Sequence, residues 1–151
     1  MFRITRIVVL GTALTTCLLF ATQGAVGSAS HDPMGTTHAS KKRIAVRVET
    51  KPAPRGVLVH AITTGYRFAP ERLSPVHGKG NVVQGEGHGH VYVDGAKTPK
   101  TMIVGPWTYI TLTPGRHTVR VTLNANDHNE WTWQGMVVEA TTRVTVPKGS
   151  M

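Results

Sequence analysis

Apolar and polar residues alternate most clearly in the stretch Thr118-Val119-Arg120-Val121-Thr122-Leu123-Asn124. The odd-numbered residues are apolar and the even-numbered ones are polar, so each kind faces one side of an extended chain. The same period of two occurs in residues 44–49 and 136–146, and shorter segments predict further strands at 57–63, 88–94 and 107–112. No segment has the period of an amphipathic helix. About seven short strands in roughly 110 residues predict an all-β, antiparallel sandwich of immunoglobulin or cupredoxin type.

Apart from its first thirty residues, the chain divides into a polar arm and one domain that contains a long irregular connection. We predict a single β-sandwich domain over residues 43–151, since 151 residues supply one hydrophobic core but not two. Residues 31–42 are polar and have no period, so we expect a flexible arm there. Residues 69–87 form a long irregular connection rich in Gly and Pro, the kind of loop that tends to carry function.

The first thirty residues have the order of a secretory signal peptide. Arg3 and Arg6 precede a mostly apolar stretch, residues 7–21, and small residues follow between positions 24 and 30. We therefore predict a signal peptide over residues 1–30, with cleavage after Gly27 or after Ser30. A membrane anchor is less favoured, because the apolar run is shorter than the about 20 residues that a span needs. The expected location is secreted, periplasmic or at the cell envelope, with no transmembrane span once the signal is removed.

Charge and cysteine content exclude several classes of protein. The net charge of the chain is +9, and removing residues 1–30 leaves 15 Lys+Arg against 8 Asp+Glu, or +7. The same cleavage removes Cys17, the one cysteine, so a disulfide scaffold, a zinc ribbon and an iron–sulfur site are excluded. The dispersed positive charge favours adsorption to anionic envelope polymers. Export and the lack of a basic face disfavour nucleic-acid binding.

Eight histidines give the strongest functional signal. His88 and His90 are two apart on a predicted strand, so their imidazoles project from one face and can converge on one metal ion. Gly87 and Gly89 beside them leave room for an ion or for close approach of another backbone. His128 follows the strand that ends at residue 124, and it supplies a third nitrogen if the two strand ends are neighbours. The alternative is that the His pair is only a solvated strand end.

Three imidazoles with an open position suit copper first and zinc second. Met136 and Met102 are candidate soft ligands, and His31 becomes a candidate copper ligand if cleavage makes it the amino-terminal residue. Glu86 and Asp127 are predicted to accept hydrogen bonds from the ring N–H groups of the ligands. His77, in the 69–87 connection, can close over such a site, but no neighbouring residue indicates its orientation.

Two motifs resemble a largely uncharacterised family of small exported bacterial β-sandwich domains. The first has the form GEGHxHxYVDG and the second LNANDH, and the resemblance covers roughly residues 56–146. The matching residues are Gly85-Glu86-Gly87-His88-Gly89-His90-Val91-Tyr92-Val93-Asp94-Gly95, Gly105-Pro106-Trp107 and Leu123-Asn124-Ala125-Asn126-Asp127-His128. The resemblance implies a β-sandwich and puts His88, His90 and His128 at motif positions. Gly89 departs from the Ala expected there, and the family supplies no reaction.

Aromatic residues support a rival interpretation. Trp107 and Tyr109 are two apart on one predicted strand, and Trp131 and Trp133 on another. If exposed, they form the surface of an envelope polysaccharide-binding module; packing against the core is the other explanation. An enzyme is less favoured, because the chain has no Gly-x-Ser-x-Gly motif and its mature part has no cysteine nucleophile. Sequence therefore predicts an exported metal-binding protein for metal carriage, buffering or sensing.

Overall fold

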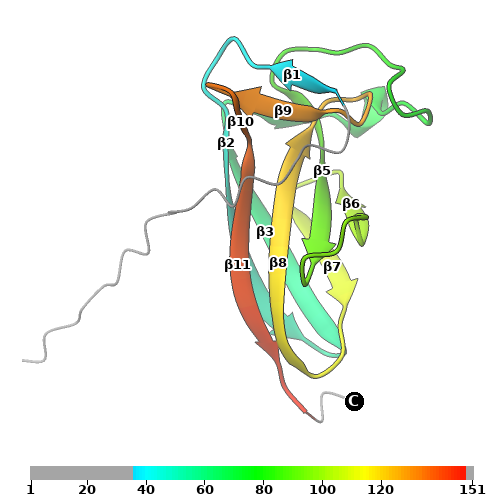
Figure 1. The fold of residues 1–151 in the computed structure, drawn as a ribbon. Coiled ribbons are helices and arrows are strands. Elements are labelled where there is room, and N and C mark those ends of the chain that lie inside the picture. The colour runs from blue at the N-terminus through cyan, green and yellow to red at the C-terminus, as the bar shows by residue number, and fades with distance from the viewer. Residues whose placement is uncertain (1–35, 149–151) are drawn as a thin grey trace, which may run out of the picture.

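The computed structural model describes residues 36–148. The predicted signal peptide, its cleavage sites and the candidate ligand His31 lie outside this part. Two sheets pack face to face, as Figure 1 shows, so the predicted all-β sandwich is confirmed. Within the described residues, no helix is both long and apolar enough to cross a bilayer.

The larger sheet has eight strands in the path β1-β9-β8-β5-β4, with β10, β11 and β6 paired to β9, β8 and β5. Its strands are β1 (Thr37–Ala39), β4 (Arg67–Phe68), β5 (Glu86–Val93), β6 (Thr101–Ile103), β8 (Gly115–Asn124), β9 (Glu130–Trp133), β10 (Met136–Val137) and β11 (Glu139–Val146). The smaller sheet has the order β2-β3-β7, with β2 (Ala45–Ala53), β3 (Gly56–Thr64) and β7 (Trp107–Thr111). One short 3-10 helix, η1 (Pro70–Arg72), follows β4.

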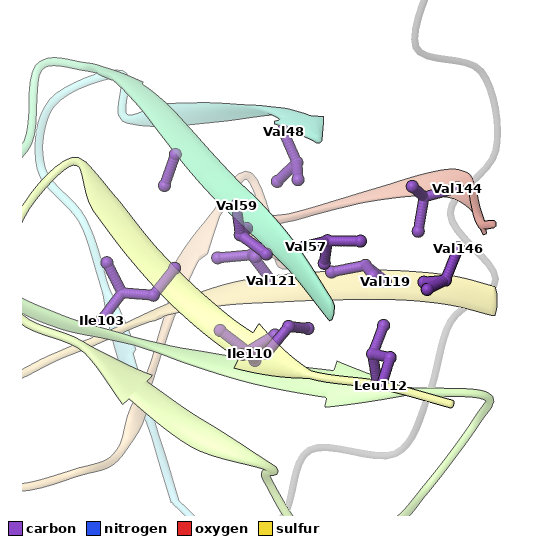
Figure 2. Close-up of a cluster of buried hydrophobic side chains, with 12 residues drawn as sticks. Val48, Val57, Val59, Ile103, Ile110, Leu112, Val119, Val121, Val144 and Val146 are labelled. Atoms are coloured by element: carbon purple, nitrogen blue, oxygen red, sulfur yellow. The ribbon is translucent and has the colours of Figure 1, made fainter. Parts of the chain in front are cut away.

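Each strand of β-branched residues gives one apolar face to the space between the sheets. Val57 and Val59 of β3 meet Val119 and Val121 of β8, and all four side chains are fully buried. Figure 2 shows these valines interdigitating with Ile110 and other apolar side chains. Burying each such side chain contributes roughly 1.5–3 kcal/mol, so this cluster is the main source of stability.

All six predicted strand segments are present, and the structure adds shorter ones. Within the described part of the arm predicted to be flexible, Thr37–Ala39 instead forms β1, parallel to β9. This pairing joins segments about ninety residues apart, and a three-residue strand has too few residues to show a period. In Figure 1, β1, β9 and the loop before β5 gather at one end of the sandwich.

Strands β5 and β8 are the pair that positions the candidate site. They are antiparallel, so the start of β5 lies beside the end of β8, with His88 opposite Asn124 and His90 opposite Thr122. Val91 and Val121 of these strands point into the core. Because successive side chains alternate, the even-numbered residues point to the other face of the sheet.

Candidate metal centre

The first two histidines lie side by side on the face of β5 that points away from the sandwich core. His88 is fully buried and His90 is 8% exposed, an unusual degree of burial for imidazoles on an outer face. Their rings point toward one another, with the two Nε2 atoms 3.0 Å apart. The prediction that the two project from one face is confirmed.

Close contact between β5 and β8 depends on a glycine. Gly87 has a φ of +150°, and a Cβ atom built there would lie 1.9 Å from the carbonyl oxygen of Asn124. On the core side of this contact, the buried Tyr66 hydroxyl lies 2.8 Å from the carbonyl oxygens of both His88 and Asn124. Burial raises the Tyr66 pKa, so the group stays a neutral hydroxyl. Gly87 and Tyr66 together hold the two strand ends in register.

His128 reaches the pair from the turn between β8 and β9. Two backbone bonds tighten this turn, because the Ala125 N–H donates to Asn129 and the His128 N–H donates to Ala125. His128 itself has a φ of +71°, a left-handed conformation that is uncommon for a residue with a side chain. The Asn124 side-chain amide donates to the His128 carbonyl at 2.9 Å, and this bond helps to hold the strained turn.

The three imidazoles form one compact cluster. One ring nitrogen from each of His88, His90 and His128 lies within 4.8 Å of the others. The ring centroids are 4.8 Å apart for His88 and His90, 4.6 Å for His88 and His128, and 5.8 Å for His90 and His128. The strand ends are therefore neighbours, and the third nitrogen that the sequence left conditional is in place.

Burial keeps the first two rings neutral. Desolvation, followed by the positive charge that a protonated His90 or His128 would carry, lowers the pKa of His88 to about 3. The same two causes, desolvation and then neighbouring histidines, lower the pKa of His90 to about 4. Both rings therefore offer nitrogen lone pairs at neutral pH, which is the form that binds a metal ion.

Hydrogen bonds assign the remaining ring nitrogens. The Nε2 atom of His128 lies 2.7 Å from the carbonyl oxygen of Ser74, so Nε2–H donates and Nδ1 keeps its lone pair. A backbone carbonyl that fixes a ring in this way is common behind metal-binding histidines. The Nδ1 atom of His88 is buried and has no hydrogen-bond partner within residues 36–148. Sequence did not identify Ser74, because its carbonyl is contributed by backbone that any residue has.

A cavity of about 470 Å³ opens beside the cluster. Met102 lies directly opposite His90 on β6 and is 42% exposed in this cavity wall. The lining includes apolar side chains and several side chains whose nitrogen, oxygen or sulfur atoms can bind a metal ion. The residues that line the cavity are His77, His90, Tyr92, Pro99, Thr101, Met102, Asn124, His128 and Glu130.

The two carboxylates predicted to orient the rings have other partners. Asp127 accepts hydrogen bonds from His38 Nε2 at 2.8 Å and from the side chain of Asn129 at 2.7 Å. Glu86 pairs with Arg67 and Arg72. Asp127 thus stabilises the turn that carries His128 and ties it to β1, whereas Glu86 belongs to an ion-pair network with Arg67 and Arg72. The role of the two carboxylates in orienting the rings stays a prediction.

Met136, the other candidate soft ligand, pairs with Trp133 in the β9–β10 hairpin. It is 54% exposed and is not among the residues that line the cavity. Of the two methionines, the structure thus brings only Met102 to the cluster.

The four aromatic residues of the rival interpretation do not form one surface. Trp131 is fully buried among apolar residues, and its ring N–H donates to the carbonyl of Glu86 at 3.1 Å. Trp133 packs against the same cluster. Trp107 and Tyr109 remain, 52% and 45% exposed on the smaller sheet. An exposed surface that includes Trp131 is therefore wrong, and packing explains that residue.

No family model matches the chain, and our searches found neither a similar curated protein nor a similar solved structure. The resemblance to exported bacterial domains, and the more specific immunoglobulin or cupredoxin type, therefore stay predictions.

Proposed function

We propose that this protein binds one transition-metal ion, copper first and zinc second, through His88, His90 and His128. The observation that carries the proposal is the convergence of three ring nitrogens within 4.8 Å of one another. Two nitrogens each about 2.0–2.1 Å from one ion lie roughly 2.9–3.4 Å apart, for square-planar to tetrahedral angles. The 3.0 Å between the Nε2 atoms of His88 and His90 falls in that interval.

The arrangement favours a bound ion over three structural histidines. A buried neutral imidazole in a stable core has partners for both nitrogens. Here the Nδ1 atom of His88 has none, and its Nε2 atom faces the Nε2 atom of a second imidazole. At most one of those two facing atoms carries a proton. A cation bound by both Nε2 atoms takes the place of that single proton and offsets the desolvation of the two rings.

Copper is favoured over zinc by the residue opposite His90. The Met102 thioether lies at the cavity wall, where it can approach an ion held by His90. Thioethers bind Cu(I) strongly and contribute little to zinc sites. Three histidines and a nearby methionine therefore suit a site that accepts copper in both oxidation states.

We further propose metal carriage, buffering or sensing at the cell envelope, in an exported protein. The basic amino-terminal segment and the net charge of +7 after its removal support export and adsorption to anionic envelope polymers. The cavity leaves one side of the cluster accessible, so an ion can be loaded and passed on. We assign no catalysed reaction to the site.

The test is metal titration of the protein purified from the whole chain, with its amino terminus read by mass spectrometry. Wild type is expected to bind one equivalent of copper, with weaker zinc binding. His88→Gln/His90→Gln is expected to lose the site, and His60→Gln/His117→Gln is the matched control because those two histidines lie outside the cluster. Equal binding by all three proteins would overturn the proposal, and an uncleaved amino terminus would overturn export.

A second function, polysaccharide binding, rests on Trp107 and Tyr109 alone. His60 stacks on the Trp107 ring at 3.9 Å between centroids, and the Tyr109 hydroxyl donates to the Pro54 carbonyl at 2.6 Å. Both rings are thus held in place, while about half of each is exposed, which suits stacking on sugar rings. Trp107→Ala is expected to abolish retention on envelope polysaccharide, and unchanged retention would remove this alternative.

A further inference from the structure

We propose that His77, on the loop between η1 and β5, is the fourth protein ligand, so that the site holds a divalent copper or zinc ion with four imidazoles. The inference rests on the metal-binding function proposed above. It adds the residue that completes the coordination and places that residue on an exposed loop.

The position of the His77 ring supports this role. Its centroid lies 5.8 Å from that of His128, at an interplanar angle of 17°. The three rings of the cluster have centroid distances of 4.6–5.8 Å among themselves, so His77 is no farther from His128 than His90 is. His77 also lines the same cavity as His90 and His128. His77 lies outside the group of nitrogens within 4.8 Å of one another, so its exposed side chain has to move toward the cluster to supply a fourth nitrogen.

The loop is fastened on both sides of His77. The Ser74 N–H donates to the Asn126 carbonyl at 2.9 Å, and the Gly78 N–H donates to the Asp127 carbonyl at 2.8 Å. The carbonyl of Ser74 in turn accepts the Nε2–H of His128. These bonds attach the loop to the turn that carries His128. The loop backbone is therefore fixed beside the turn on both sides of His77, and the exposed His77 ring stacks on that of His128.

Glu130 and Met102 also line the cavity and have side chains that can bind metals. Glu130 lies opposite Asn124, which in turn lies opposite His88. Its backbone is therefore two strand spacings, about 9–10 Å, from that of His88. Met102 is closer, but its thioether suits Cu(I) rather than a divalent ion. His77 supplies the neutral nitrogen that both Cu(II) and Zn(II) prefer.

The experiment compares wild type, His77→Ala and the control His60→Gln, whose histidine lies outside the cluster, each loaded with one equivalent of Cu(II). Electron paramagnetic resonance reports the equatorial nitrogens, and competition titration reports affinity. His77→Ala is expected to bind Cu(II) at least about tenfold more weakly and to change the spectrum. It is also expected to become sensitive to added azide, because an exchangeable water then takes the fourth position. Wild type and His60→Gln are expected to keep one spectrum that azide does not alter.

The outcomes separate this inference from the proposed function. If wild type binds no metal ion, both are overturned. If wild type binds Cu(II), and His77→Ala has the same affinity and spectrum, only the role of His77 is overturned. In that case azide alters the wild-type spectrum as well, because solvent already occupies the fourth position. Because His77 is exposed, His77→Ala is expected to fold, and an unchanged thermal melt of the metal-free protein verifies this.

Discussion

The two faces of the β5–β8 pair are equally buried but chemically opposite. On the core face, Val91 and Val121 are fully buried among other apolar side chains. On the outer face, His88, Thr122 and Asn124 are also almost fully buried, although all three are polar. The core face is explained by the hydrophobic effect alone. The outer face is not, because burying polar groups costs free energy unless each one finds a partner.

Coverage accounts for this difference. The opposite sheet covers the valines, whereas the turn carrying His128 and the loop carrying Ser74 cover the polar face. Thr122 donates to the Asn124 side chain at 2.8 Å, and Asn124 donates to the His128 carbonyl. The threonine and asparagine are thus satisfied, whereas the Nδ1 atom of His88 has no hydrogen-bond partner among the described residues. A buried polar face on which two imidazoles face one another is typical of a binding site rather than of a second core.

The largest loss of stability is expected from a substitution at Gly87, because its close contact with the Asn124 backbone holds both faces of the β5–β8 pair in place. Gly87→Ala places a Cβ atom against the carbonyl of Asn124 and demands a φ that alanine avoids. We expect a loss of about 3 kcal/mol or more in the free energy of unfolding, together with loss of metal binding. Gly89→Ala is the control, because its nearest contact is 3.2 Å and no left-handed φ is required. Urea denaturation of both variants measures the difference, and similar midpoints would contradict the assigned role of Gly87.

Acid is expected to destabilise the polar face of the metal-free protein before it affects the core. The pKa values of His88 and His90 are about 3 and about 4 in the folded chain, against 6.5 for an ordinary imidazole. Below pH 6.5 the unfolded chain takes up protons that the folded chain does not, so folding stability falls as pH falls. The lowered pKa of each ring is expected to reduce the free energy of unfolding by roughly 2 kcal/mol between pH 6.5 and pH 5, at about 1.4 kcal/mol per pH unit.

Denaturation of the metal-free protein at pH 7, 6 and 5 measures this slope. Most carboxylates stay ionised in this range, so the histidines dominate the change. In His90→Asn the free energy of unfolding is expected to depend less steeply on pH, because the contribution of the His90 ring is absent. A wild-type stability that does not change between pH 7 and pH 5 would show that the rings are solvated rather than buried.

The smallest and most specific effects on stability and metal binding are expected from two substitutions. One places a polar side chain on the core face, and the other places an apolar side chain on the outer face. Val121→Thr buries a hydroxyl in the apolar core, at a cost of about 1–3 kcal/mol. Thr122→Val removes the donor to Asn124, and we expect a loss of about 1 kcal/mol. Only Thr122→Val is expected to weaken metal binding, by a few-fold, because Asn124 holds the His128 carbonyl. Calorimetric titration of both folded variants tests this, and equal affinities would separate the Thr122–Asn124 contact from the site.

The sequence was sufficient for the long strands and for two of the three clustered histidines. Alternation in β8 and β11 predicts their faces, because side chains of an extended chain change sides at every residue. The same rule predicts that His88 and His90 act together. It does not predict β1 or the role of His38, which meets Asp127 only because two distant segments pair. Nor does the alternation rule show that Asp127 forms its hydrogen bonds with His38 and Asn129 rather than with the three clustered imidazoles.

Sequence alone thus determined the strand pattern, the basic charge and the local His88–His90 pair, since each depends on residues close along the chain. Only the tertiary structure decided that His128 joins this pair and that the Ser74 carbonyl orients the His128 ring. It also decided that Met102 and His77 line the same cavity. It also decided that Trp131 is buried rather than available for binding. The physical reason is that antiparallel register brings together the start of one strand and the end of another, a relation set by packing of the whole sheet.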